Sequence, residues 1–182
     1  MKLALMIIDM QKELYVGHTK DQMDRAAEYI NYILPKFEEK NLPVIYVQAL
    51  DEGEGVVPGT EGFEIIDSLK PKSNSTVIHK RYANSFNKTE VDKIFRNAGV
   101  DTVVMTGFCA EFCVLSTYRG AKDLDYFPVI LKNGIASTEE PNKEFVEKIS
   151  ETITARMLEK LLKDQPADLA AEHTEEMTIG RG

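Results

Sequence analysis

The sequence is poor in cysteine: Cys109 and Cys113 are the only two, and they lie four residues apart. A single pair cannot form the disulfide framework that stabilises many small secreted proteins. With no third or fourth cysteine and no histidine close by, the pair also offers too few ligands for structural zinc. Three explanations stay open for it: a reversible disulfide, two packing residues, or one reactive cysteine beside one that packs.

Positive charge is also scarce. The 22 lysines and arginines are outnumbered by 30 aspartates and glutamates, which gives a formal net charge of -8. The phosphates of nucleic acids and anionic lipids bind cationic surfaces, because that binding releases counterions. We therefore expect neither a nucleic acid nor a membrane as a partner.

Long apolar runs are missing as well. No segment approaches the roughly 20 apolar residues that cross a bilayer. The opening "MKLALMII" is short, runs directly into Asp9 and lacks a small-residue cleavage site, so it is interpreted as a buried strand and not as a secretory signal. Two cysteines and no such signal predict a cytoplasmic protein.

The sequence does contain short apolar runs that alternate with helical patterns along 182 residues, a length typical of one domain. The runs are continuous, which is typical of strands buried on both faces of a parallel sheet. The predicted strands are Leu3–Asp9, Pro43–Gln48, Thr76–Lys80, Thr102–Gly107 and Pro128–Lys132, with a short sixth at Glu151–Thr154.

Helical spacing predicts helices between these strands. Thr89 is expected to cap the second of them, and Gly99 follows its end. Strands and helices that alternate through right-handed crossovers predict an α/β fold: a three-layer α/β/α sandwich, Rossmann-like and doubly wound, around about six mainly parallel strands. The predicted helices are 21–40, 89–97, 114–124, 141–149 and 155–163.

The predicted domain covers residues 1–163, and residues 164–182 form a polar C-terminal tail. The tail is interpreted as a frayed terminus or as an arm that lies on another subunit. The segment Asp51–Gly62 is rich in glycine and acidic residues but lacks the Gly-Lys-Ser/Thr ending of a phosphate-binding loop. It is interpreted as a surface loop or as a mobile lid.

Reactive side chains follow three of the predicted strands. Asp9 closes the first strand, Lys80 closes the third, and Cys113 comes after the fourth. Each has an ordinary structural explanation, because aspartate caps helices, lysine at a strand end is solvated and cysteine fills cores. Ligands collect at the carboxyl ends of parallel strands, so the three together favour a catalytic site with a base, a cation and a nucleophile.

Cys113 is expected to be the reactive cysteine of the pair. A helix N-terminus, an ammonium group and a base all favour the thiolate, and Cys113 is placed to have all three. Cys109 lies in the strand-to-helix turn, where its N–H can help to bind an oxyanion while its thiol packs. The histidines offer no metal site, because His79 faces away from Lys80 and the other two, His18 and His173, lie in a loop and in the tail.

Four motifs occur in order along the chain: "IIDMQKEL", "PGTEGFEI", "HKRYANSFNKT" and "TGFCAEFCVLSTYRGAKDLDY". With them the sequence resembles the isochorismatase-like cysteine hydrolase family, which includes nicotinamidases, carbamoylsarcosine and ureidoacrylate amidohydrolases, and isochorismatases. The resemblance extends over 3–163. It implies a six-stranded parallel sheet and a homodimer or homotetramer.

Position by position, the resemblance implies a triad in which Asp9 is the general base, Lys80 the cation and Cys113 the nucleophile. It also implies a cis peptide between Phe108 and Cys109. The backbone N–H groups of Cys109 and Cys113 would then form an oxyanion hole. No cofactor is implied.

The chain departs from the family pattern in three places. Ala110 stands where threonine is frequent, and Leu14 stands where phenylalanine or tyrosine is frequent. The zinc-binding Asp-x-His cluster of nicotinamidases would fall near "QALDEGEG" and is missing, which argues against nicotinamide as substrate. Isochorismatases proper lack the active cysteine, so Cys113 argues against hydrolysis of a vinyl ether.

The sequence therefore predicts a metal-independent cysteine amidohydrolase that cleaves a C–N bond in a small carboxamide or ureido compound. Substrate specificity is expected to reside in loops that carry Leu14, Tyr15, Tyr82, Phe86 and Phe108. Two alternatives are a thiol redox or binding protein on the same scaffold and an isochorismatase-type hydrolase of another small metabolite.

Overall fold

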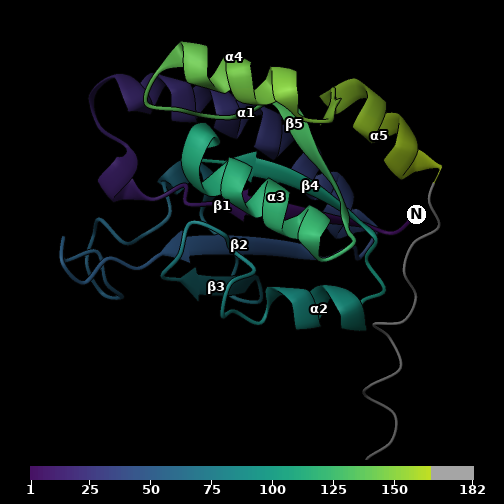
Figure 1. The fold of residues 1–182 in the computed structure, drawn as a ribbon, viewed down its shortest axis with the longest axis horizontal. Coiled ribbons are helices and arrows are strands. Elements are labelled where there is room, and N and C mark those ends of the chain that lie inside the picture. Colours follow the sequence, from purple (N-terminus) through teal and green to yellow (C-terminus); the bar gives the residue numbers. More distant parts are fainter. Residues whose placement is uncertain (165–182) are drawn as a thin grey trace, which may run out of the picture.

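The fold, in a computed structural model that describes residues 1–164, is a parallel sheet between two layers of helices. Figure 1 shows α3 in front of the sheet and α1 behind it. In chain order the elements are β1 (Leu3–Ile8), η1 (Lys12–Leu14), α1 (Gly17–Glu39), β2 (Val44–Ala49), η2 (Asp67–Leu69), β3 (Thr76–Lys80), α2 (Val91–Asn97), β4 (Thr102–Gly107), η3 (Ala110–Val114), α3 (Leu115–Asp123), β5 (Phe127–Ile135), α4 (Glu140–Ile149), β6 (Thr152–Ile153) and α5 (Ala155–Lys163).

The sheet has six strands in the order β3-β2-β1-β4-β5-β6, and every neighbouring pair is parallel. The predicted three-layer α/β/α sandwich is confirmed. From β1 the chain adds strands outward through β2 to β3, and from β4 it adds them in the other direction. Doubly wound sheets bind ligands in the crevice at the carboxyl ends of the strands where the strand order reverses, which here is between β1 and β4.

Two apolar clusters, one on each face of the sheet, form the core. All six residues of β1 are buried, and alternate side chains belong to opposite faces. Leu5 packs with residues of α1 and α5, and Met6 packs with residues of α2 and α3. Burial of each such side chain contributes about 1.5–3 kcal/mol, so β1 is held rigidly from both sides.

Helix α1 begins at Gly17, four residues before the predicted start, so His18 lies in a helix and not in a loop. The prediction was wrong because the first turn is held by a side chain that apolar spacing does not reveal. Thr19 Oγ1 accepts a hydrogen bond from the Val16 N–H (3.3 Å) and donates to backbone carbonyls at Val16 and Leu14.

Helix α2 begins at Val91, and its N-cap is Glu90 instead of the predicted Thr89. The Thr89 hydroxyl donates to the Ser85 carbonyl (2.6 Å) and accepts a longer bond from the Val91 N–H (3.4 Å), so this side chain joins the preceding loop to the first turn of α2. Gly99 follows the helix with a positive φ of 67°, as expected for a residue just beyond a C-terminus.

Three further boundaries differ from the predicted ones. Helical structure after β4 begins at Ala110, because the π-helical turn η3 precedes α3. Strand β5 runs to Ile135, three residues beyond the prediction, and β6 is shorter than predicted. The predicted tail lies outside the described residues except for Asp164, and His173 lies outside them too. Within residues 1–164 no helix is long and apolar enough to cross a membrane.

Candidate active site

The structure brings the three predicted catalytic side chains together at the β1/β4 crevice. Asp9 directly follows β1, Lys80 is the last residue of β3, and Cys113 lies in η3 after β4. The Lys80 Nζ lies 2.7 Å from Asp9 Oδ2 and 3.1 Å from Cys113 Sγ. One ammonium group therefore contacts both the carboxylate and the sulfur.

Asp9 and Lys80 form a buried ion pair. Asp9 is 1% exposed and Lys80 is 3% exposed. Asp9 adopts a positive φ of 50°, a region that aspartate tolerates better than most residues, and the chain turns sharply here at the end of β1. Within the described residues, Asp9 Oδ1 has no hydrogen-bond partner. A buried carboxylate with a free oxygen is well placed to accept a proton.

Burial dominates the electrostatics of this pair. It raises the pKa of the Asp9 carboxyl group, and the nearby Lys80 ammonium partly opposes that shift. Burial acts to lower the pKa of Lys80, but its contacts with Asp9 and Cys113 outweigh burial and raise that pKa, so Lys80 stays cationic. A carboxylate with a raised pKa is a stronger base than an ordinary one.

The expectation of a preformed thiolate at Cys113 is not supported. Burial and the Asp9 carboxylate raise the pKa of Cys113 to about 11, and the Lys80 ammonium only partly opposes them. Cys113 also lies inside a helical turn and not at its first residue, because η3 begins at Ala110. The resting site therefore holds a Cys113 thiol and not a thiolate, so a reaction of the sulfur requires a base that accepts its proton.

The turn between β4 and η3 has the geometry that the resemblance implies. The Phe108–Cys109 peptide bond is cis. Gly107 has a φ of 113°, and a side chain there would collide with the backbone of Ile8. Within residues 1–164 the Cys109 N–H has no hydrogen-bond acceptor, so it is available to a ligand oxygen. The turn can supply one donor of an oxyanion hole, and Cys113 lies within the helical turn that follows.

Cys109 is buried, and its thiol is bonded to Glu111 and not to Cys113. Its Sγ donates to Glu111 Oε2 (2.9 Å), and both cysteines are free. Burial and the Glu111 carboxylate raise the pKa of Cys109 to about 12. Sequence reasoning missed Glu111, because its other partners, Ser137, Thr138 and Asn142, lie 26 to 31 residues further along the chain.

Three other polar residues hold the site together and were also missed. Gln11 is buried and joins the ends of neighbouring segments: its side chain donates to the carbonyls of Ala49 and Phe63 and accepts from the Ala49 N–H. Ser85 and Thr117 bond each other through their hydroxyls (2.9 Å), which ties the loop after Lys80 to α3. All three belong to the quoted motifs, which was the signal available in the sequence.

The five predicted specificity residues differ in their burial and contacts. Leu14 and Tyr15 are partly buried, and the Tyr15 hydroxyl donates to Asp24 (2.6 Å). Tyr82 is 42% exposed and accepts a hydrogen bond from Lys88. Phe108 is buried in the core, and Phe86 is buried against other aromatic rings, so neither side chain has an open face of its own.

The segment Asp51–Gly62 folds into a turn beside the site. Asp51 and Val56 form an antiparallel bridge, and Asp51 Oδ1 accepts from the N–H groups of Gly53 and Glu54. Arg81, which follows Lys80, forms an ion pair with Glu52 (2.7 Å). His79 packs edge-on against Phe63 and does not join the triad.

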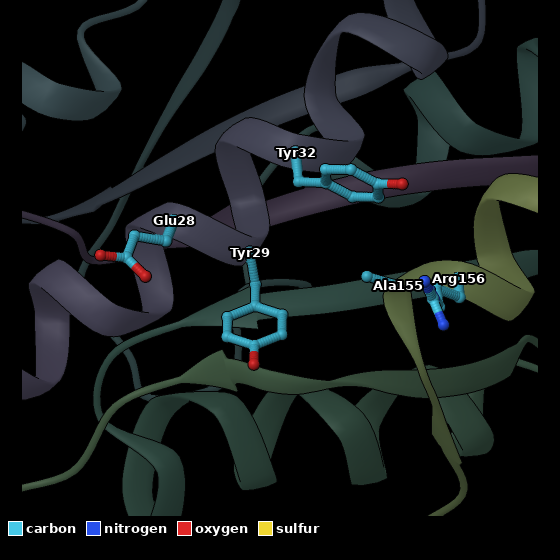
Figure 2. A pocket seen from close by; sticks show the side chains of 5 residues that line it. All are labelled: Glu28, Tyr29, Tyr32, Ala155 and Arg156. Carbon is cyan, nitrogen blue, oxygen red and sulfur yellow. The ribbon is translucent and has the colours of Figure 1, made fainter.

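A surface hollow of about 420 Å³ lies elsewhere on the molecule (Figure 2). Its lining comes from α1 and from the start of α5, and no triad residue contributes. The lining residues are Glu28, Tyr29, Tyr32, Ala155 and Arg156. This hollow is separate from the crevice that holds Asp9 and Cys113.

Comparison with known proteins identifies the class to which this fold and site belong. Residues 3–158 match the isochorismatase domain. The chain therefore belongs to the isochorismatase family of hydrolases.

Individual relatives agree with this assignment. The chain is 31% identical over 144 residues to the uncharacterized isochorismatase family protein YddQ of Bacillus subtilis, over 76% of this chain and 79% of that protein. It is 27% identical over 143 residues to the secreted isochorismatase effector Isc1 of Verticillium dahliae, over 76% and 74%. The crystal structure of N-carbamoylsarcosine amidase from Thermoplasma acidophilum superimposes with a TM-score of 0.75 at 26% identity, covering 85% of this chain and 97% of that one.

Proposed function

We propose that this protein is a cysteine amidohydrolase that cleaves a C–N bond in a small carboxamide or ureido compound. The observation that carries the proposal is the contact of one buried ammonium, Lys80 Nζ, with both Asp9 Oδ2 (2.7 Å) and Cys113 Sγ (3.1 Å). This arrangement joins a base, a cation and a nucleophile in a crevice with a free backbone N–H.

The first half of the reaction forms an acyl-enzyme. Asp9 accepts the Cys113 proton while the sulfur bonds to the substrate carbonyl carbon, and the carbonyl π electrons move to oxygen. The N–H groups of Cys109 and Cys113 bind that oxyanion. The C–N bond then breaks as Asp9 returns the proton to the leaving nitrogen, which leaves a thioester on Cys113.

The second half uses water and restores the enzyme. Asp9 accepts a proton from water while the water oxygen bonds to the thioester carbon. The C–S bond breaks, the acid leaves, and the sulfur regains its proton from Asp9. Lys80 remains charged throughout and balances each anion as it forms, since its ammonium contacts both partners.

Two findings support an amide over other substrates of the family. Cys113 occupies the nucleophile position next to a carboxylate. The structural relative at 26% identity is an amidase of N-carbamoylsarcosine, a ureido compound. A thiol redox function is less well supported, because the Cys109 thiol is directed to Glu111 and not to Cys113.

We also propose that the enzyme works in the cytoplasm. Two free cysteines and a net charge of -8 suit a reducing cytoplasm without nucleic-acid or membrane partners. No step of the proposed reaction requires a metal or cofactor.

The test is hydrolysis of an amide and ureide library, read by ammonia release and by intact mass spectrometry. We expect turnover of at least one compound and an acyl mass increment on Cys113. Cys113→Ala should abolish both signals, and the neighbouring Ser116→Ala should retain them. Loss of two hydrogens on mild oxidation, with no turnover of any compound, would instead support the redox alternative.

A further inference from the structure

The Glu111 carboxylate has an unusually complete set of hydrogen-bond donors. Oε2 accepts from the Ser137 hydroxyl (2.7 Å) and the Cys109 thiol (2.9 Å). Oε1 accepts from the Asn142 amide (2.9 Å) and the Thr138 hydroxyl (3.0 Å). Four donors on one carboxylate fix its position closely, because loss of any one leaves a partly buried group unsatisfied.

These donors come from two different parts of the chain. Cys109 lies in the turn before η3, in the same segment as Glu111, whereas Ser137, Thr138 and Asn142 belong to the β5–α4 connection and the first turn of α4. Glu111 is therefore the polar link between the turn that carries the nucleophile and a neighbouring segment.

That neighbouring segment is itself rigid. Ser137 is completely buried, and its N–H donates to Gln22 of α1 (3.2 Å). The Ser137 hydroxyl also accepts from the Glu139 N–H (3.0 Å). On the other side of the link, the Ala110 N–H donates to the Ala136 carbonyl (2.8 Å). Glu111 thus joins η3 to a connection that is held by the core.

From this geometry we propose that Glu111 is a positioning residue: it anchors the Cys109–Cys113 turn to the β5–α4 connection and keeps the Cys109 thiol turned away from the reacting centre. The inference rests on the proposed function for its catalytic part only. Glu111 touches neither the Asp9–Lys80 pair nor Cys113 Sγ in any contact of the described residues. Its influence on the reaction passes through the backbone N–H of Cys109.

The same contact protects the second cysteine. A thiol that donates to a carboxylate is held protonated, since a thiolate next to Glu111 would place two negative charges together. Cys109 therefore does not compete with Cys113 as a nucleophile. It also does not place a negative charge next to the developing oxyanion.

The test compares Glu111→Gln with Glu147→Gln. Glu147 Oε1 also accepts a backbone hydrogen bond, from the Asn133 N–H (2.7 Å), but this bond ties α4 to β5 and not to η3. In Glu111→Gln an NH₂ group replaces one of the two carboxylate oxygens. Each of these oxygens accepts two hydrogen bonds, and an NH₂ group cannot accept them. We expect kcat to fall by about 10- to 100-fold with KM changed by less than about 3-fold, because only oxyanion binding is impaired. Glu147→Gln should match the wild type.

Labelling with iodoacetamide, mapped by mass spectrometry, gives a second readout that needs no substrate. In Glu111→Gln, Cys109 should become labelled at least several-fold faster, and Cys113 labelling should stay within about 2-fold of wild type. If the wild type hydrolyses no amide, the proposed function fails but this arm still tests the inference. Ser137→Ala, which removes one donor only, should give smaller changes in the same directions and serves if Glu111→Gln does not fold.

Two results would overturn the inference. One is an unchanged kcat together with a Cys109 that stays protected in both variants. The other is a parallel loss of kcat and of Cys113 labelling, since that would mean Glu111 only maintains the fold.

Discussion

At the scale of single residues, Asp9 acts on Cys113 in two opposing ways. Its negative charge raises the pKa of the Cys113 thiol, which reduces the thiolate present at rest. The same carboxylate is a buried base with Oδ1 unpartnered within the described residues, and in the proposed reaction it accepts the thiol proton when the sulfur attacks. The two effects can be separated by replacing Asp9 with a neutral residue of similar shape.

We expect Asp9→Asn to slow hydrolysis by roughly two to four orders of magnitude, because the proton acceptor is lost. Alkylation of Cys113 at pH 8 should become faster in the same variant, since removal of the negative charge lowers the thiol pKa. Both rates are measured on protein shown to be folded by circular dichroism. A variant that hydrolyses at the wild-type rate would remove Asp9 from the mechanism.

Asp9 and Lys80 are also expected to contribute jointly to the free energy of unfolding. Removal of either partner leaves an uncompensated charge in a buried site, which costs about 3–5 kcal/mol. The double variant Asp9→Asn with Lys80→Met should recover most of that loss, because no buried charge remains unpaired. Urea unfolding of the wild type, both single variants and the double variant measures this coupling. Strictly additive losses would show that the two side chains do not interact.

Glu111 gives the protein an acid-sensitive contribution to stability. Burial alone would raise its pKa, but hydrogen bonds from Cys109, Ser137 and Asn142 lower the pKa from 4.5 to about 2. A carboxylate with a lowered pKa in the folded state stabilises the fold above pH 4.5, and this stabilisation is lost as the pH falls toward 2. We expect the difference in unfolding free energy between wild type and Glu111→Gln to be largest at neutral pH and to shrink across this window. A pH-independent difference would contradict the shift.

At the scale of elements, the sequence predicted the strands well and the helix ends less well. Continuous apolar runs identify buried parallel strands directly, so all six strands lie where they were predicted within a few residues. The start of α1 depends on the Thr19 side chain, and the start of α2 depends on Thr89 bonding backward to Ser85. Hydroxyl groups can bond in either direction along the chain, and spacing does not indicate which direction is used.

The turn after β4 could be placed from the sequence, but its shape could not. Periodicity gives the same apolar pattern for an α-helix and for the π-helical turn η3 that carries Cys113. The Glu111 contacts to Ser137, Thr138 and Asn142 join residues 26 to 31 positions apart. These residues are close together because β4 pairs with β5 and because of the shape of the loop after β5. Local sequence patterns predict neither feature.

The turn after β4 requires a backbone conformation at Gly107 that other residues rarely adopt. We expect Gly107→Ala to destabilise the protein by more than about 2 kcal/mol, because a Cβ there meets the Ile8 backbone and the φ of 113° is unfavourable for alanine. Gly59→Ala is the matched control: its φ is 93°, but a Cβ there has no atom within 4 Å. Thermal unfolding of both variants separates the collision from the strain. Equal effects would mean that β4 and β1 can move apart.

At the scale of the whole molecule, the layers followed from the sequence because alternating strands and helices admit few topologies. The arrangement of the triad also followed, since the carboxyl ends of parallel strands meet at one sheet edge. The residues that contact the substrate stay a prediction. Phe86 and Phe108 are buried in the structure, and aromatic side chains in a sequence do not distinguish a pocket from a core.

Three large apolar side chains of the described residues are exposed on two elements that contact each other, η3 and α4, and we treat them as one apolar patch. They are Phe112 on η3 and Phe145 and Ile149 on α4, which are 62%, 56% and 46% exposed. Four-residue spacing places Phe145 and Ile149 on one face of α4, and η3 contacts that helix. Glu144 and Lys148 lie on the exposed side of α4, also four residues apart. Two α4 helices packed antiparallel about a two-fold axis would pair these charges reciprocally and cover both patches.

We therefore expect the protein to form a homodimer through this patch, next to Cys113. Sedimentation of the wild type at micromolar concentration should give the mass of two chains, and Phe145→Glu should shift it to one chain, because a buried charge opposes the contact. Phe127→Glu is the matched control, since Phe127 is also 56% exposed but lies at the opposite end of the sheet, at the start of β5. A wild type that sediments as a single chain, or a dimer equally weakened by Phe127→Glu, would rule this surface out.

If the expected pattern holds, the activity of Phe145→Glu shows whether the second chain helps to enclose the substrate. A rise in KM with kcat unchanged would place the partner surface at the mouth of the site.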